Sequence, residues 1–294
     1  MKKILIAFFL LSTFTLSSND FQLVWEDNFD QPELNENNWT VVINGKGGGN
    51  KELQYYRREN ISIDKEAETG ASCLVITAKK ENYRCRRATS GRLMTKDKMS
   101  FKYGMVEARI KLPKTANGLW PAFWMLGSDY PEAVWPKCGE IDILEAGNVT
   151  GIKNGTQEYL FNGACHWGEK FNKGAYPHYS NEMVSPYSIQ EGFHLYTLIW
   201  DEEKLTMYLD KDKYPNAAPY FEMPITGDGQ VDHPSRYFHK EFFLIFNLAV
   251  GGNFPGIWKI KEVTALKNGD ARMYVDYVRV YQKGNETETI SIGK

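Results

Sequence analysis

Short strand-like segments recur along almost the whole chain, and they constrain the fold more than any other feature. Turn residues such as Pro113, Gly127 and the pair Gly251-Gly252 separate them. Alternation of apolar and polar residues with a period of two is typical of half-buried strands, and helical periodicity is scarce. The pattern predicts an all-β sandwich of antiparallel sheets. The clearest segments are 73–80, 104–112, 139–144, 194–201, 204–210, 241–250 and 271–282.

The strand pattern continues without a linker or an internal repeat, which favours a single domain. The chain has 294 residues, enough for a substantial core. We expect this domain to span residues 20–283. The last segment, 284–294, is polar, and we expect it to be a loose tail.

The first 19 residues are typical of a secretory signal peptide. Lys2 and Lys3 precede an apolar run from residue 4 to 16, and small or polar residues follow it. This run is too short for a membrane span, and no other segment is apolar enough for one. No cysteine follows the run to accept a lipid anchor. We therefore expect a secreted or periplasmic protein, which we also expect to be a monomer.

Charge and cysteine content narrow the partners and leave the disulfides open. The formal net charge is -2, so nucleic acid is not expected as a partner. Export permits disulfides, and the four cysteines allow three pairings that the sequence cannot distinguish. Free thiols are an equal alternative. The cysteines are Cys73, Cys85, Cys138 and Cys165.

The segment CGEIDILEAGN, residues 138–148, places three carboxylates within one predicted strand. Glu140 and Asp142 alternate with isoleucines, so both acids lie on one face. The alternation then slips, because Leu144 stands where a polar residue is due. A β-bulge at Ile143-Leu144 would return Glu145 to the face of the other two acids. Like charges among apolar neighbours repel and lose hydration, so we interpret this row as functional.

Paired carboxylates of this kind can hydrolyse glycosidic bonds. A retaining glycosidase holds its nucleophile and its acid/base about 5–5.5 Å apart. Glu140 and Glu145 fit that gap if their side chains converge across the bulge. Asp142, between them, can share a proton with a neighbouring carboxyl, so that one acid stays protonated near neutral pH.

With these residues in view, the chain resembles glycoside hydrolase family 16, whose bulged signature is Glu-x-Asp-x-x-Glu. The resemblance is closest to the laminarinase-like branch. It implies a β-jelly-roll sandwich with a concave substrate cleft. Further segments that resemble the family are 47–56, 90–113, 118–127, 242–256 and 273–282.

The resemblance also implies an activity and a role for each acid. It implies an endo-acting, retaining hydrolase of β-1,3-glucan or of mixed-linkage β-1,3-1,4-glucan, with a β-glucan poly- or oligosaccharide as its partner. Glu140 matches the nucleophile, Glu145 the acid/base and Asp142 the assisting acid. No cofactor is implied for catalysis.

Further residues match sugar-binding or metal-binding positions of the family, each with a plainer structural alternative. Core packing is the alternative for the tryptophans, turn chemistry for the residues of the 47–56 loop, and a surface salt bridge for Arg92. Asp276 matches a position that binds structural calcium in many members. The substrate-binding candidates are Asn50, Glu52, Arg92, Trp120, Trp124, Trp135, His166 and Trp167.

Two segments, 168–188 and 224–243, depart from the family pattern and could tune linkage preference. Three alternatives remain at this stage. One is a hydrolase of galactans such as agarose or carrageenan, and another is a transglycosylase. The third is a glucan-binding protein without activity, although such proteins lose the acids that this chain retains.

Overall fold

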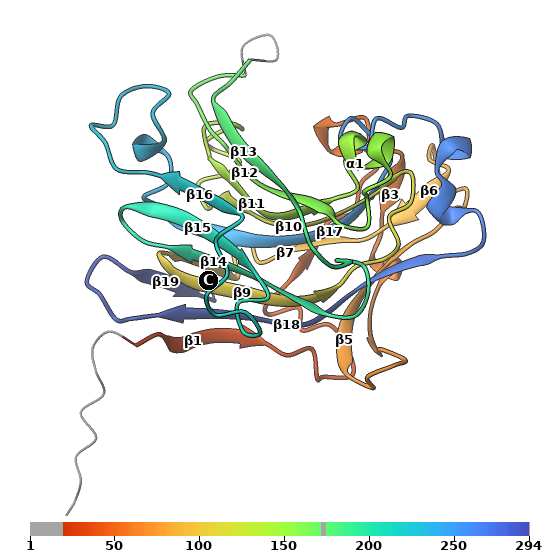
Figure 1. Cartoon of the computed structure of the whole chain (residues 1–294), viewed down its shortest axis with the longest axis horizontal. Helices are drawn as coiled ribbons and strands as arrows, with labels where there is room; N and C mark the ends of the chain where they lie inside the picture. Colours follow the sequence, from red (N-terminus) through yellow and green to blue (C-terminus); the bar gives the residue numbers. More distant parts are fainter. Residues whose placement is uncertain (1–19, 172–174, 294) are drawn as a thin grey trace, which may run out of the picture.

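The computed structural model describes residues 20–171 and 175–293. Two large antiparallel sheets lie one above the other, and short loops cover their ends (Figure 1). This arrangement confirms the all-β sandwich, and each of the seven predicted segments contains a strand. The predicted signal peptide, 1–19, lies outside the described residues.

One sheet has eight strands in the order β16-β15-β14-β9-β18-β5-β4, and β1 also pairs with β18. Its central strand β9 alternates strictly between buried and half-buried residues, as the sequence pattern predicts. The bounds are β1 Gln22–Asp27, β4 Ile61–Lys65, β5 Ser72–Ala78, β9 Gly104–Lys111, β14 His194–Trp200, β15 Lys204–Leu209, β16 Phe221–Pro224 and β18 Ala271–Gln282.

The other sheet has nine strands and contains the acidic segment as β11. Its main path is β13-β12-β11-β10-β17-β7-β2, and β8 joins β17 to β19. The bounds are β2 Thr40–Val41, β7 Arg92–Met94, β8 Met99–Lys102, β10 Leu119–Gly127, β11 Glu140–Ala146, β12 Leu160–His166, β13 His178–Val184, β17 Phe242–Val250 and β19 Thr289–Ile292.

The remaining elements are short and lie in the connections. Strands β3 (Gln54–Tyr56) and β6 (Ala88–Ser90) form a parallel pair. The α-helix α1 spans Val149–Asn154, and the 3-10 turns are Gly47–Gly49, Arg58–Asn60, Pro234–Arg236, Ile260–Glu262 and Thr264–Leu266. In Figure 1, β13 rises on one side of the nine-stranded sheet, and α1 with β3 and β6 lies on the other.

The main hydrophobic core lies between the two sheets. Ile141 and Phe123 enter it from the nine-stranded sheet, and Val106 and Leu198 enter it from the eight-stranded sheet. All four side chains are fully buried. Each such burial contributes about 1.5–3 kcal/mol, so the inward-facing half of each strand stabilises the sandwich. The outward-facing half of β11 is left to carry the acids.

The end of the chain corrects one expectation. Residues 289–292 are not loose, because β19 pairs with β8 along its whole length. The Gln282 amide donates to the Thr289 carbonyl at 2.9 Å, and the Ser291 hydroxyl donates to Glu241 at 3.1 Å. Ile290 packs against the main core. The polar composition of 284–294 hides the short alternation Thr-Ile-Ser-Ile.

The four cysteines are free thiols, the alternative that the sequence left open. Cys73, Cys138 and Cys165 are buried, whereas Cys85 is exposed. The described residues therefore reach this fold without a disulfide, through core packing and sheet pairing.

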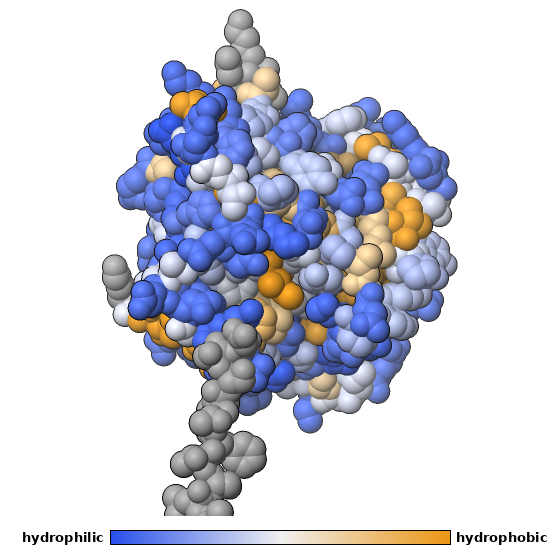
Figure 2. Space-filling model, turned by 60° about the vertical axis from the view of Figure 1, so that its left-hand side comes forward, coloured by the Kyte–Doolittle hydropathy of each residue, from blue (hydrophilic) through white to orange (hydrophobic). Residues whose placement is uncertain are grey.

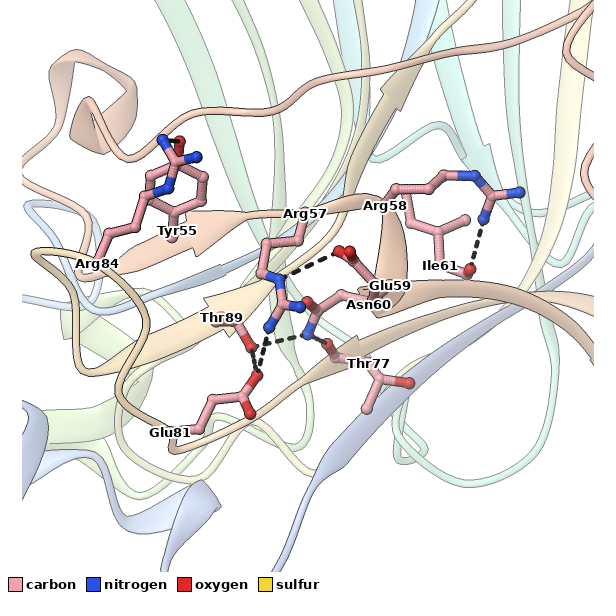
Figure 3. A network of polar contacts seen from close by, with 10 residues as sticks. All are labelled: Tyr55, Arg57, Arg58, Glu59, Asn60, Ile61, Thr77, Glu81, Arg84 and Thr89. Carbon is pink, nitrogen blue, oxygen red and sulfur yellow. Dashed lines mark hydrogen bonds and ion pairs between the residues drawn. The ribbon is translucent and has the colours of Figure 1, made fainter.

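A polar network fixes the loop between β5 and β6 (Figure 3). Arg57 lies between Glu59 and Glu81, at 3.2 Å from each carboxylate. The buried Asn60 amide donates to the Thr77 carbonyl at 2.8 Å, and the Arg84 guanidinium donates to a tyrosine hydroxyl of β3. The network therefore holds β3 and β6 together beside the 45–52 loop.

Arg86, in the loop that this network fixes, holds the 45–52 loop directly. Its guanidinium donates to the Gly45 carbonyl at 2.8 Å and to the Glu52 carbonyl at 3.1 Å. The segment predicted to contact substrate therefore has a rigid base.

The surface is largely hydrophilic on the face that Figure 2 shows, with small scattered groups of hydrophobic residues. Within residues 20–171 and 175–293, no helix is long and apolar enough to cross a membrane.

Candidate active site

The predicted bulge is present in β11. Against β10, Leu144 lies opposite Phe123 and Asp142 lies opposite Trp124, and the register shifts between these two pairs. Ile143 is thus the extra residue, and it points into the core together with Leu144. Two consecutive inward side chains are what a bulge produces.

The other neighbour, β12, shows the same shift. Asp142 pairs with Ala164 and Glu145 pairs with Asn162, so only Gly163 lies opposite the two bulged residues. The shift returns Glu145 to the outer face with Glu140 and Asp142. The prediction of one row of three acids is confirmed.

Two contacts stabilise the bulge. The buried Tyr220 hydroxyl donates a hydrogen bond to the carbonyl of Ile143, which the bulge removes from the regular ladder. A Cβ at Gly163 would lie 2.7 Å from the Met207 sulfur and 3.1 Å from Phe221, so a side chain larger than hydrogen does not fit there. The bulge is therefore specified from the core side as well as by β11 itself.

The pKa values of all three acids are raised, chiefly by burial. Burial is the largest cause that raises the pKa of Glu140 to about 8, and the charge of Asp142 adds to it. Burial and the charge of Glu145 raise the pKa of Asp142 well above its usual range. Burial also raises the pKa of Glu145. The row therefore retains a proton near neutral pH, as the sequence predicts.

Glu145 is oriented by two neutral donors. The Trp120 indole donates to its Oε1 at 3.0 Å, and the Asn162 amide donates to its Oε2 at 3.0 Å. Both donors favour the ionised carboxylate and partly oppose the effect of burial on its pKa. Trp120 is itself stacked on Phe254, with ring centroids 4.7 Å apart. Trp120 thus touches an acid directly, as its predicted place on the substrate face requires.

His166 lies across β12 from the other two acids. Its Nε2 is 3.2 Å from Asp142 Oδ2 and 3.9 Å from Glu140 Oε1. Ligand-type atoms of these three residues lie within 4.8 Å of one another, an arrangement that can also hold a metal ion. The imidazole therefore adjoins two of the three acids.

Trp124 and Arg92 lie beside the row on the same face. The Trp124 indole donates to Asn247 Oδ1 at 2.8 Å, and the Arg92 guanidinium lies 4.6 Å above the Trp124 ring. Because Trp124 pairs with Asp142 across β10 and β11, this unit adjoins the acids directly. Both residues are half-buried, so they are accessible from the open face.

The 47–52 loop presents its two predicted residues differently. Asn50 is half-buried, and its carbonyl accepts from the backbone N–H of Asn253, which joins this loop to the one after β17. Glu52 is buried, and its carboxylate accepts from Gln54 at 2.5 Å and from the Tyr56 hydroxyl at 3.0 Å. Glu52 therefore holds the loop together from within.

The remaining two predicted tryptophans lie in different places, one beside the acids and the other in the main core. Trp135 lies near the acids, with its ring centroid 6.4 Å from that of His166. Trp167 belongs to the main core, where it contacts Phe238 and donates to the Asp232 carbonyl at 2.8 Å. The prediction of Trp167 as a substrate-binding residue is wrong, because it follows His166 directly and points away from the row.

Asp276 does not fit the expected calcium site. Arg109 Nη1 lies 2.5 Å from Asp276 Oδ2, so a guanidinium already compensates the carboxylate. Arg109 in turn lies over the Phe193 ring at 4.3 Å. A calcium ion needs several oxygen ligands, whereas this acid is paired with a cation.

The acids face outward from the sheet rather than into an enclosed cavity. A hollow of about 920 Å³ does exist, but it is lined by residues such as Lys111, Gln190 and Ala271 and by none of the acids. An open face bearing acids, indoles and a guanidinium suits a long polymer that binds across the strands.

Comparison with known proteins identifies the family. A family model described as glycosyl hydrolases family 16 matches residues 15–223. The chain belongs to this family.

Solved family 16 structures agree over nearly their whole length. A Bacteroides ovatus mixed linkage glucan protein, solved in complex with a product, is 38% identical over 87% of this chain and 99% of its own, with a TM-score of 0.75. The catalytic domain of an endo-1,3-beta-glucanase (laminarinase) from Thermotoga petrophila is 33% identical over 90% of this chain and 99% of its own, with a TM-score of 0.72.

A curated relative is longer. The clotting factor G alpha subunit of Tachypleus tridentatus is 35% identical over 92% of this chain, but the match spans only 35% of that protein. This chain therefore spans about a third of that relative's length.

Sequence reasoning missed four residues of this family 16 site: Asn162, Asn247, Tyr220 and Tyr176. Asn162 could have been predicted, because alternation along β12 places it on the same face as His166. Tyr220 could not have been predicted, because its contact with Ile143 joins segments 77 residues apart.

The bulge predicts an effect of Tyr220→Phe. Without the hydroxyl, the Ile143 carbonyl stays buried and unsatisfied, so we expect a loss of about 1–3 kcal/mol in the free energy of unfolding. Denaturant unfolding measures this, and the exposed Tyr214→Phe serves as a matched control with a change under about 0.5 kcal/mol. Equal stability of the two variants would show that Tyr220 does not support the bulge.

The raised pKa of Glu140 predicts a pH-dependent effect of Glu140→Gln. The folded protein holds this proton up to about pH 8, whereas the unfolded chain loses it near the ordinary value of 4.5. The wild type therefore loses stability as pH rises from about 4.5 to 8, and the amide does not. The stability lost over this range is about 4–5 kcal/mol, so we expect the variant's Tm to exceed the wild-type Tm by roughly 8 °C or more at pH 8 and by little at pH 4.5.

Thermal unfolding at several pH values checks this prediction. Glu33→Gln, at an exposed carboxylate, is the control and should show no such trend. A difference for Glu140→Gln that is the same at pH 4.5 and pH 8 contradicts the raised pKa.

Proposed function

We propose that this protein is an endo-acting, retaining β-glucanase that cleaves β-1,3-glucan, mixed-linkage β-1,3-1,4-glucan or both. The observation that carries the proposal is the bulge, which aligns Glu140, Asp142 and Glu145 on one outward face. Within the described ranges, none of the three carboxylates pairs with a basic side chain at salt-bridge distance apart from His166. The row is thus available to act on a substrate.

The mechanism uses the two outer acids in turn. Glu145 protonates the glycosidic oxygen while Glu140 attacks the anomeric carbon, which breaks the bond and forms a glycosyl-enzyme. Glu145 then accepts a proton from water, whose oxygen attacks the same carbon and releases the sugar with its configuration retained. The donors from Trp120 and Asn162 hold Glu145 in one orientation through both steps.

Asp142, the middle acid, accepts the proton that Glu140 must lose. Because the pKa of Glu140 is raised to about 8, Glu140 must lose a proton before it can attack. Asp142 lies between the two glutamates, and His166 is 3.2 Å from it. Together they accept the proton from Glu140 and keep one acid of the row protonated for the leaving group. No metal or redox cofactor enters this scheme.

Glucan is the substrate that the relatives support. One of the two solved structures is the Bacteroides ovatus mixed linkage glucan protein and the other is an endo-1,3-beta-glucanase, and both are matched over 99% of their length. Trp120 and Trp124 offer flat apolar surfaces beside the acids, and Arg92 offers donors for sugar hydroxyls. Linkage preference between the two glucans depends on the loops around this face.

The first residues of the chain indicate where the enzyme acts. We infer export, because Lys2 and Lys3 followed by the apolar run to residue 16 form a signal peptide pattern. An exported, monomeric enzyme would meet its polysaccharide outside the cytoplasm.

Product analysis tests the proposed activity. The wild-type protein should release oligosaccharides from laminarin, from cereal mixed-linkage glucan or from both, and proton NMR should show the β configuration of the first-formed products. Glu140→Gln should lose at least about 1,000-fold in kcat while it stays folded. Agarose and carrageenan are the control polymers. Products from these galactans alone, or near-normal activity of the variant, would refute the proposal.

Labelling of the nucleophile tests the roles of the two glutamates. A gluco-oligosaccharide with fluorine at C2 and a good leaving group slows both steps, but the leaving group lets the first proceed, so the glycosyl-enzyme accumulates. We expect mass spectrometry to find the label on Glu140. A label on Glu145 would reverse the two roles, and no label would contradict a covalent intermediate.

A further inference from the structure

Five aromatic side chains cluster at the Glu140 end of the acidic row. They come from three segments: the loop before β11, the end of β12, and the loop leading into β13 with the first residue of that strand. We call them the aromatic wall: Trp135, His166, Phe171, Tyr176 and His178.

The five rings form a continuous contact network. Tyr176 is central, at 4.8 Å from Trp135, 5.6 Å from His166, 5.6 Å from Phe171 and 5.5 Å from His178 between ring centroids. His166 and His178 stack at 5.9 Å across β12 and β13. Aromatic pairs at such distances stabilise one another, so the wall is a unit.

The wall faces the acids. His166 belongs to both, since its Nε2 is 3.2 Å from Asp142. The pKa of the Tyr176 hydroxyl is raised by burial and then by the negative charges of Glu140, Asp142 and Glu145, so this hydroxyl lies within the electrostatic field of the row. In Figure 1, β12 and β13 rise beside β11 on this side of the sheet.

The wall is anchored from behind. Trp135 packs against a second apolar cluster on the outer face of β10 and β17, which contains Leu126, Phe243 and Ile245. The other aromatic residues of the wall therefore pack against a Trp135 indole that is held in place.

The base of the loop that bears Phe171 and Tyr176 is also fixed. The Trp167 backbone N–H donates to the Pro177 carbonyl at 3.1 Å and closes the base of the loop. Glu169 forms ion pairs with Lys137 and Arg236, each at 3.0 Å. A preorganised surface binds a ligand with little ordering cost.

The free side of the wall is apolar and accessible. Phe171 is 55% exposed, which is unusual for a phenylalanine in contact with two other aromatic groups. His178 is also exposed. Flat aromatic surfaces beside catalytic acids suit an uncharged ring with an apolar face, which a β-linked glucopyranose has on both sides because its hydroxyls are equatorial.

We propose that the aromatic wall is a sugar-binding subsite for a glucosyl ring next to the ring that is cleaved, with Phe171 and Tyr176 as its specificity-determining residues. This inference rests on the proposed glucanase function. Phe171, Tyr176 and His178 lie within segment 168–188, where the sequence led us to expect a departure from the family pattern. An oligosaccharide too short to reach the wall does not gain the binding affinity that the wall contributes.

Substrate length provides the test. Phe171→Ala and Tyr176→Ala should each raise KM for a laminari-hexaose or mixed-linkage hexasaccharide about 3- to 10-fold, with kcat within about 2-fold. The shortest oligosaccharide that the wild type cleaves should be affected less. Tyr176→Phe keeps the ring and should behave as the wild type. In a Glu140→Gln background, calorimetry should show the same fold-loss in hexasaccharide affinity.

Tyr179→Ala is the matched control. Tyr179 also lies on β13, one residue after His178, but points to the other face, where it contacts Phe221 at 5.2 Å. It should leave KM unchanged for every length. If the wild type cleaves glucans but the wall variants match the control, or lose equally for all lengths, the inference is overturned. If the wild type cleaves no glucan, the proposed function itself fails.

Discussion

The structure depends on one constraint: three carboxylates must share the outer face of a strand whose inner face belongs to the main core. A regular strand cannot place Glu140, Asp142 and Glu145 together, because the fifth position after Glu140 falls on the wrong side. The extra residue at Ile143 solves this geometry and creates a free carbonyl inside the sandwich. Tyr220 satisfies that carbonyl from the segment before β16, so the active-site row depends on a hydroxyl from another part of the fold.

The charges of the row oppose the packing that holds it. The pKa values of all three acids are raised chiefly by burial, so ionising the row destabilises the folded state. The opposite faces of β10 and β11 compensate, because residues such as Phe123 and Ile141 are fully buried between the sheets. A large sandwich can therefore tolerate an acidic strand that a smaller core could not.

The sequence predicted the parts of the fold that depend on local periodicity. The seven strand segments, the phase slip after Asp142 and the resulting row all follow from alternation between two faces. Prediction failed where a residue's role depends on its partner. Asp276 looked available for calcium, but Arg109, which lies far away in sequence, already pairs with it.

The other two errors have equally specific causes. Trp167 was grouped with His166 because the two are adjacent, although neighbouring residues at a strand end point in opposite directions, and Trp167 enters the core. The tail 284–294 looked loose because four residues of alternation are too short to stand out. Its strand β19 exists because β8 offers it an edge. Such pairings carry no local signal in the sequence.

The division between sheet and loops explains how reaction and selectivity can vary separately. The acids, Trp120 and Trp124 lie on strands paired on both sides, where a shift of one residue would turn every side chain over. Phe171 and Tyr176 of the aromatic wall and the 47–52 loop instead lie in connections. Each connection has its own anchor, Glu169 with its two ion pairs and Arg86 with its two carbonyls. A change in either loop can alter which sugars bind while the bulge and the row stay in place. Under the proposed function, the chemistry thus belongs to the sheet, and the choice of glucan belongs to the loops around it.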